Sequence, residues 1–328
     1  MSKLEQRDVL KWKKVSVIIP VKEINDYIRE AMLHYLELDY PNFEVLIFPD
    51  HPTDETFPLA RIISSGPVGP AEKRDMALTH ATGDIFAFID DDAYPRKDWL
   101  RNAVALLEKE DVGAVGGPAV TAPSDNVLEQ AGGLVYESFM CSGKYTYRYI
   151  PGTEHEDDDL PSVNLIVKRE VFAAVNGYDS NFYPGEDTKL CLDITHKASK
   201  KLLYAPDILV YHHRRPLFAA HLKQITNYAK HRGYFVKALP DTSLRPQYFI
   251  PTLFTAGLLL GPLLSLIFPF LWWVYSAVLI LYLMLCGYSV RKAAGMKEFL
   301  LAVAGIFCSH VGYGIYFVRG LLSKKLLR

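Results

Sequence analysis

The sequence predicts an α/β protein with a doubly wound, mostly parallel sheet, followed by a C-terminal helical transmembrane region. Two observations carry this prediction. Short apolar runs alternate with helical patterns over residues 15–115, and no charged residue occurs in residues 246–290. The length of 328 residues suits two domains. We therefore expect a soluble domain over 1–235, a juxtamembrane linker over 236–247 and a membrane region over 248–328.

Each expected strand of the soluble part is a short apolar run, and two of them end in carboxylates. Asp50 follows the second run, and Asp90, Asp91 and Asp92 directly follow the third. Ligands bind doubly wound sheets at the carboxyl ends of the strands, so both features predict one ligand site. The expected strands are residues 15–20, 43–48, 84–90 and 112–115, with helices beginning at Asn25 or Asp26 and covering 71–79 and 99–109.

The run Asp90–Asp92 predicts a cation site. Three adjacent carboxylates at the end of a buried strand repel one another unless a cation or a hydrogen-bond donor neutralises them. Mg²⁺ or Mn²⁺ bridging a diphosphate would do this. The other interpretation is a solvated acidic surface. The sequence contains no P-loop and no GxGxxG motif, so it offers no support for those nucleotide sites.

Further chemistry-bearing residues lie between residue 150 and the membrane region. Glu186 and Asp187 follow Gly185, and they either cap a helix or supply a carboxylate base. His212 and His213 follow the strand-like run 208–211, and a histidine beside a metal can be a ligand as well as a structural residue. The acidic run 152–160 has no strand before it, so we expect a mobile, solvated loop there.

Basic residues gather just before the membrane region. Arg214, Arg215, Lys230 and Arg232 are either electrostatic membrane anchors or binders of a diphosphate. The segment His221–Arg245 is rich in Lys, Arg and Tyr, which suits the headgroup level of a bilayer.

The membrane region holds two or three helices. Residues 248–288 as one helix would be about 60 Å long, twice the hydrocarbon thickness of about 30 Å. We therefore expect helices over about 248–268 and 270–288, with Pro262 and Pro269 as candidate breakers. A third run, 299–318, either spans or is re-entrant or interfacial, because a third full span violates the positive-inside rule. His310 in this run is either a helix-packing residue or a polar group that faces a lipid-linked substrate.

Composition and charge exclude several classes. Residues 246–328 contain seven Lys/Arg and one acid, so residues 1–245 carry −7 of the total charge of −1. An acidic soluble part disfavours nucleic-acid binding. The four cysteines form no CxxC pair, which disfavours a zinc site or a disulfide scaffold. Residues 1–14 are polar and contain no apolar signal-peptide core, so we expect the soluble part to stay in the cytoplasm.

The order of these motifs resembles glycosyltransferase family 2, with its GT-A fold, over about residues 14–235. The matching features are an apolar strand ending in Pro20, an Asp after the second strand, a Lys-Arg-Asp segment, a DxD motif and a late Glu-Asp. A further segment, 224–233, resembles the juxtamembrane helix of membrane-attached members that make surface polysaccharides. Two departures bear on specificity. The first is that Pro49-Asp50-His51-Pro52 stands where the family has Asp-Asp-Gly-Ser, which bears on base specificity. The second is that the residues beginning at Gln224 do not form the Gln-x-x-Arg-Trp motif of processive synthases, which argues against processive synthesis.

The resemblance implies roles for particular residues. The nucleotide sugar would be bound by Pro20, Glu23, Asp50, Lys73, Arg74, Asp90 and Asp91. Asp92 would ligate Mg²⁺ or Mn²⁺, with His212 or His213 as a second ligand. Asp187 would be the catalytic base, beside Glu186. The acceptor or the diphosphate would be contacted by Asn164, Lys230 and Arg232.

The implied function is an inverting, metal-dependent glycosyltransferase. It would move sugar from a nucleotide-diphosphate sugar to a lipid-linked saccharide in surface glycan synthesis. It would be a multi-pass protein of the inner or plasma membrane with a cytoplasmic catalytic domain, and other glycan-assembly enzymes are possible partners. Two alternatives stay open. In the first, the acceptor is a polyprenyl phosphate, which needs no strong base. In the second, the chain is a non-catalytic scaffold that binds nucleotide sugar.

Overall fold

The computed structural model describes residues 12–180 and 182–326. The chain forms two compact units: residues 12–120 with 150–180 and 182–212, and residues 121–149 with 213–326. This division differs from the expected boundary at residue 235, because residues 121–149 and 213–235 pack with the C-terminal helices. Residues 1–11, which entered the expectation of a cytoplasmic location, lie outside the described residues.

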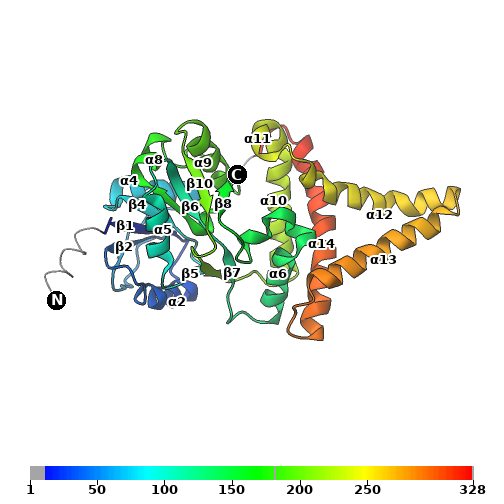
Figure 1. Cartoon of the computed structure of the whole chain (residues 1–328), viewed down its shortest axis with the longest axis horizontal. Coiled ribbons are helices and arrows are strands. Elements are labelled where there is room, and N and C mark those ends of the chain that lie inside the picture. Colours follow the sequence, from blue (N-terminus) through cyan, green and yellow to red (C-terminus); the bar gives the residue numbers. More distant parts are fainter. Residues whose placement is uncertain (1–11, 181, 327–328) are drawn as a thin grey trace. The chain divides into compact units, whose positions relative to one another are not determined.

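The first unit contains an eight-stranded sheet in the order β3-β2-β1-β4-β9-β6-β10-β8. Several of its strands are labelled in Figure 1. Four strand pairs are parallel and three are antiparallel, so the predicted mostly parallel sheet is confirmed. The apolar runs form its centre, because β-branched and aromatic side chains on both faces are covered. The strands are β1 Val15–Pro20, β2 Phe43–Phe48, β3 Ala60–Ile62, β4 Ile85–Phe88, β6 Val112–Gly116, β8 His155–Asp157, β9 Leu165–Lys168 and β10 Lys201–Tyr204.

Strand β9 lies antiparallel between β4 and β6, in the middle of the sheet. All four of its residues are buried. The sequence pattern did not predict it, because only three apolar residues separate Asn164 from Lys168. The structure thus brings Asn164, at the start of β9, to the same edge of the sheet as the end of β4.

The acidic run 152–160 is not the loop that the sequence predicted. Residues 155–157 form β8, an edge strand antiparallel to β10. The strand forms because the edge of β10 offers unpaired backbone groups, and the His155 ring packs against Tyr204 with centroids 4.9 Å apart. Glu156 remains exposed, which blunts this edge of the sheet.

A smaller, three-stranded sheet is built in the order β5-β11-β7. Strand β5, Ala93–Pro95, follows Asp92 directly, and it pairs antiparallel with β11, Val210–His212. The register sets His212 opposite Ala93. Strand β7 is Ala119–Thr121. This sheet therefore brings the predicted histidine segment next to the predicted acidic run.

Helices of the first unit bury one apolar face each. In α2 the Asn25 side chain accepts the Ile28 N–H at 3.0 Å, which confirms the predicted start, and Ile28, Met32 and Tyr35 are buried. Helix α3 packs against β1 and α9 against β10. The bounds are α2 Asp26–Tyr35, α3 Pro70–Asp75, α4 Ala77–His80, α5 Trp99–Leu107, α8 Arg169–Ala174 and α9 Glu186–His196.

The second unit is helical. Three of its helices are long and apolar enough to cross a membrane, by length and composition: 246–267, 271–289 and 296–322. The predicted pair of helices is confirmed, with Pro269 in the turn and Pro262 inside a helix. The elements are α6 Val127–Glu137, α7 Phe139–Ser142, α10 Ala219–Ala238, α11 Pro240–Ser243, α12 Ile250–Ile267, α13 Leu271–Ser289 and α14 Met296–Leu322, with 3₁₀ turns at Gly143–Arg148 and Pro246–Phe249.

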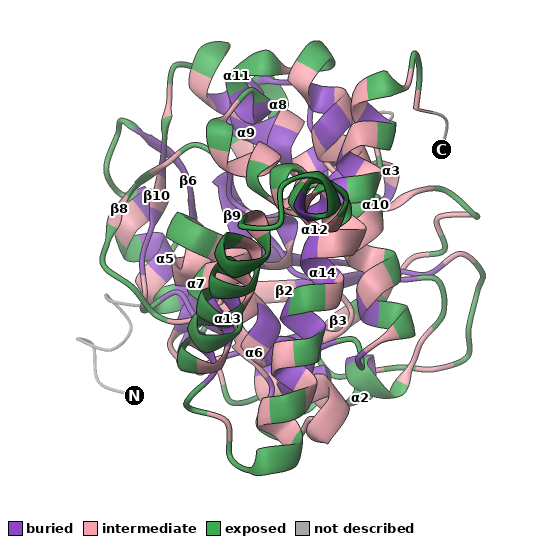
Figure 2. Cartoon of the chain, turned by 90° about the vertical axis from the view of Figure 1, so that its right-hand side faces the viewer, coloured by how far each residue is buried: buried purple, intermediate pink, exposed green. Residues whose placement is uncertain are grey.

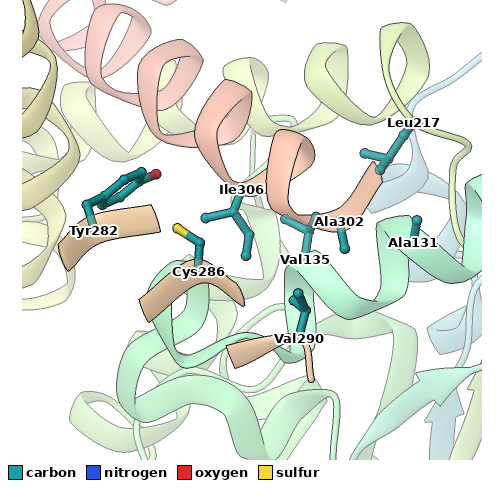
Figure 3. Close-up of a cluster of buried hydrophobic side chains, with 8 residues drawn as sticks. All are labelled: Ala131, Val135, Leu217, Tyr282, Cys286, Val290, Ala302 and Ile306. Carbon is teal, nitrogen blue, oxygen red and sulfur yellow. The ribbon is translucent and has the colours of Figure 1, made fainter. Parts of the chain in front are cut away.

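Helix α14 is the packing centre of the second unit. A cluster of buried side chains joins it to α13 and α6 (Figure 3): Ala131, Val135, Leu217, Tyr282, Cys286, Val290, Ala302 and Ile306. His310 lies near this cluster, with Nδ1 2.8 Å from the Tyr282 hydroxyl and Nε2 2.9 Å from the Met140 carbonyl. Both ring nitrogens are thus used inside the protein, which supports the helix-packing interpretation of His310.

Candidate active site

The loop after β1 and the end of β2 meet at Asp50. The Lys73 ammonium group, on α3, donates to an Asp50 carboxylate oxygen and to the Val21 carbonyl. Lys73 is buried, so this ion pair holds α3 against the loop after β1. The Asp50 backbone N–H donates to the Lys22 carbonyl at 2.9 Å. Pro20 is buried at the end of β1, and Glu23 is exposed in the loop that follows.

Arg74 links two of the predicted acidic groups. Its Nη2 lies 2.6 Å from Asp90 Oδ1, and its Nη1 lies 3.0 Å from Glu186 Oε1. The side chain is only 4% exposed, and its guanidinium lies over the Tyr178 ring at 5.4 Å. Arg74 therefore fixes the start of α9 to the end of β4, which are about a hundred residues apart in the chain. The geometry brings the DxD-like run and the Glu-Asp pair into one site.

The two members of the Glu-Asp pair differ in environment. Glu186 is buried, and this burial, together with the negative charge of Asp187, raises its pKa to about 7, although Arg74 opposes the shift. Asp187 is only half-buried, and its carboxylate accepts the Thr188 N–H at 2.8 Å. Gly185 precedes them with φ of 110°, a left-handed conformation that glycine adopts without strain. Asp187 is thus the more accessible carboxylate.

Asp91 is held by a residue that the sequence analysis placed only as a helix cap. Asn25 Nδ2 donates to Asp91 Oδ2 at 2.6 Å while its Oδ1 caps α2. Burial raises the pKa of Asp91 to about 6, and the neighbouring charges of Asp92 and Asp90 add to this shift. The crowding of carboxylates inferred from the sequence is therefore present. The position of Asn25 after an apolar strand was the available signal for its role.

Asp92 and His212 lie together. His212 Nε2 is 3.1 Å from Asp92 Oδ1, and both side chains are less than a quarter exposed. His213 is directed elsewhere, because its Nδ1 is 2.6 Å from Asp125 Oδ1 in the second unit. Within residues 12–180 and 182–326, no three His, Cys, Asp or Glu side chains are arranged to hold a metal ion.

The donor set of Asp92 and His212 nevertheless fits a divalent cation that is shared with a substrate. Mg²⁺ is commonly held by one or two carboxylates together with substrate phosphates, and Mn²⁺ accepts oxygen and imidazole ligands. The chain would supply these two groups, and a diphosphate would supply the remaining oxygens.

The three residues predicted to contact acceptor or diphosphate belong to different units of the chain. Asn164 is 2% exposed; its amide oxygen accepts from Trp99 Nε1 at 2.8 Å, and its Nδ2 donates to the Ile208 carbonyl at 2.7 Å. These bonds use the Asn164 side chain within the core, so the structure does not bring it to a ligand. Lys230 and Arg232 lie on α10 in the second unit.

Comparison with known proteins identifies the class. Residues 16–172 match the model of Glycosyl transferase family 2. The chain is 24% identical over 243 residues to a dolichyl N-acetyl-α-D-glucosaminyl phosphate 3-β-D-2,3-diacetamido-2,3-dideoxy-β-D-glucuronosyltransferase of Methanococcus voltae, covering 68% of this chain and 74% of that protein. It is 26% identical over 219 residues to glycosyltransferase AglE of Haloferax volcanii, covering 62% and 67%.

The solved structure of mannosyltransferase PcManGT from Pyrobaculum calidifontis, in complex with GDP-Man and Mn²⁺, has the same fold. Its TM-score is 0.56 at 23% identity, over 98% of this chain and 94% of that one. The fold and the family match agree with the site described above. Residues 16–172 are therefore similar to glycosyltransferase family 2, and the chain is a glycosyltransferase with a GT-A-like domain.

Proposed function

We propose that this enzyme is an inverting, metal-dependent transferase that uses a nucleotide-diphosphate sugar and a membrane-associated, lipid-linked saccharide. The observation that carries the proposal is the bridge of Arg74 between Asp90 and Glu186. This bridge joins the acidic strand end, which suits a diphosphate and its cation, to the carboxylate pair, which suits an acceptor hydroxyl. The name of the Methanococcus relative, which includes a dolichyl-linked saccharide phosphate, supports a lipid-linked acceptor.

The chain's own groups suit the two halves of this reaction. A divalent cation at Asp92 and His212 would stabilise the negative charge that develops on the departing nucleoside diphosphate. Asp187 would take the proton of the acceptor hydroxyl as that hydroxyl attacks the anomeric carbon, and in-line attack inverts the configuration. Glu186 and Arg74 would keep Asp187 in place. The ion pair of Asp50 with Lys73 would line the nucleobase side, with Pro20 and Glu23.

The second unit suits the surface of an anionic membrane. Its described residues contain fifteen Lys/Arg and five Asp/Glu. Two of these cations contact tyrosines. The Arg232 guanidinium lies over the Tyr248 ring, 4.9 Å from its centroid, and Arg245 Nη1 donates to the Tyr145 hydroxyl at 2.9 Å. Such amphipathic groups favour the headgroup level. We place the catalytic unit on the cytoplasmic side of the inner or plasma membrane, where other glycan-assembly enzymes would act.

The deciding experiment is a panel of nucleotide sugars incubated with purified enzyme in nanodiscs, with Mg²⁺ or Mn²⁺, scored by released nucleoside diphosphate. Mn²⁺ is a suitable first choice, because the solved PcManGT complex contains it. Lipid-linked saccharide and polyprenyl phosphate are compared as acceptors. Transfer to the saccharide supports the proposal, transfer to the lipid phosphate alone replaces its acceptor, and donor binding without any turnover supports a scaffold.

The role of the basic helix is tested separately with Arg232→Ala and Lys230→Ala. Acceptor binding predicts a raised acceptor KM with little change in donor KM and unchanged membrane retention. Electrostatic anchoring predicts weaker retention with unchanged KM. An unchanged acceptor KM in both variants removes these residues from the acceptor site.

A further inference from the structure

The three apolar helices of the second unit differ in how much apolar surface they expose. In residues 250–289, which contain α12, α13 and their turn, twenty large apolar side chains are more than a third exposed. In the 27 residues of α14, only five large apolar side chains are exposed to this extent. Figure 2 shows exposed residues along much of α12 and α13, whereas α14 carries many buried and half-buried residues. Hydropathy alone does not reveal this difference.

Helix α14 is covered because it runs along α10. His221 Nε2 lies 3.1 Å from Ser309 Oγ, and Lys237 Nζ donates to the Ser323 carbonyl at 2.7 Å. Between them Gly320 lies against the Lys230 carbonyl so closely that an added Cβ would come within 1.9 Å. The contacts advance in the same order along both helices, so α10 and α14 are parallel neighbours over about 15 residues of α14.

Helix α10 cannot enter hydrocarbon at low cost. It carries Lys223, Lys230, Arg232 and Lys237 over four turns, and Lys223 and Lys237 are exposed. A charged side chain within a bilayer core is expensive unless it reaches water or a partner. If α14 crossed the membrane, its packing would draw this charged helix into the hydrocarbon with it. The N-terminal part of α14 is likewise covered by α6, since an added Cβ on Gly305 would come within 2.7 Å of the Val135 side chain.

The α12–α13 hairpin is attached to α14 only near its open end. Thr252 Oγ1 donates to the Gly314 carbonyl at 3.1 Å, and Tyr282 bonds to His310. Beyond these points the hairpin projects away from α14 (Figure 1). Its two helices meet at the turn 268–270, which reads Phe-Pro-Phe and is followed by Trp272 and Trp273.

We propose that the α12–α13 hairpin alone enters the bilayer, and that α14 lies outside the hydrocarbon beside α10. Both ends of the hairpin then lie on one side of the membrane. Arg245 before it, Arg291 and Lys292 after it, and Lys324 and Lys325 after α14 all lie on that side, which satisfies the positive-inside rule. A third span would place Lys324 and Lys325 on the opposite side and violate this rule, whereas insertion of the hairpin alone does not.

The first test is the side on which the segment after α14 lies. Lys292→Cys and Ser323→Cys are made in the full chain and labelled with a membrane-impermeant maleimide in sealed vesicles of known orientation. The unmodified chain gives the background from its native cysteines. We expect both positions to react from the same side. Reaction from opposite sides shows that α14 spans and overturns the proposal.

The second test introduces charge into the two kinds of helix. Leu259 in α12 and Val278 in α13 are exposed, and Ile315 in α14 is the matched exposed control. We expect the double variant Leu259→Lys/Val278→Lys to lose at least tenfold in partition to carbonate-washed membranes, while Ile315→Lys partitions like the parent. Equal loss in Ile315→Lys, or full retention of the double variant, contradicts the proposal. Circular dichroism in detergent checks that the variants are folded.

Discussion

The catalytic unit contains two sets of acidic residues that differ in solvent exposure and in their partners: those of the candidate active site and those of the run 152–160. Asp90 and Asp91 at the end of β4 and Glu186 at the start of α9 are partly or fully buried. Each has a specific partner: Arg74 for Asp90 and Glu186, and Asn25 for Asp91. In the run 152–160, Glu154 and Glu156 are more than half exposed and form loose ion pairs with lysines. Asp159 at the end of the same run is buried, and it accepts the Thr188 hydroxyl at 3.0 Å. The difference shows that burial and partners, rather than acidity, distinguish a site from a solvated surface.

The largest effect should come from removing the base. Asp187→Asn is nearly isosteric and cannot accept a proton, so we expect kcat to fall about 10²–10⁴-fold. Donor binding, measured by calorimetry with the nucleoside diphosphate, should change little. Glu156→Gln serves as the control from the exposed group. Normal turnover of Asp187→Asn would make Asp187 structural and favour the lipid-phosphate acceptor.

The next effect concerns the cation. Asp92→Ala removes one of the two groups that would hold it, and exhaustive chelation should give the same loss. We expect activity to fall about 10²-fold or more, since stabilisation of the leaving group by a metal contributes several kcal/mol. Activity is measured with and without added Mn²⁺ or Mg²⁺. Full activity after chelation, or in a folded Asp92→Ala protein, would rule out metal dependence.

A smaller effect is expected in the pH dependence of stability. Glu186 has its folded pKa raised from 4.5 to about 7, so the folded state binds more protons than the unfolded state between these values. The free energy of unfolding should therefore fall as pH rises from about 4.5 to 7, by on the order of 2 kcal/mol from this group.

The check is urea unfolding in detergent, without metal or donor, across that pH window. Glu186→Gln carries no titrating proton and should give a flatter profile than the parent protein. The same slope in both proteins would show that the buried environment of Glu186 does not govern its titration.

The smallest effect is expected from the exposed acidic residue Glu156. Glu156 lies 3.8 Å from Lys201, and both side chains are about half exposed or more. Exposed pairs of this kind contribute about 0–1 kcal/mol. We expect Glu156→Gln to keep full activity and to change the free energy of unfolding by less than about 0.5 kcal/mol. A large loss of activity would show that the edge run belongs to the site after all.

The sequence alone determined the features that depend on local pattern. Four buried strands (β1, β2, β4 and β6), the acids after β2 and β4, a helix start at Asn25 or Asp26, and an apolar hairpin with Pro262 or Pro269 as its breaker were readable. Each follows from residues that are neighbours in the chain. The pairing of a strand end with a ligand site could also be anticipated, since carboxyl ends of parallel strands share one edge.

Only the tertiary structure decided which side chains meet. Arg74 contacts both Asp90 and Glu186, and His212 rather than His213 lies beside Asp92, because the register of β5 and β11 and the insertion of β9 are set by contacts between distant segments. Likewise α14 and the α12–α13 hairpin have similar hydropathy, yet α14 is covered by α10. Periodicity reports that a face is apolar, and it does not report whether protein or lipid covers that face.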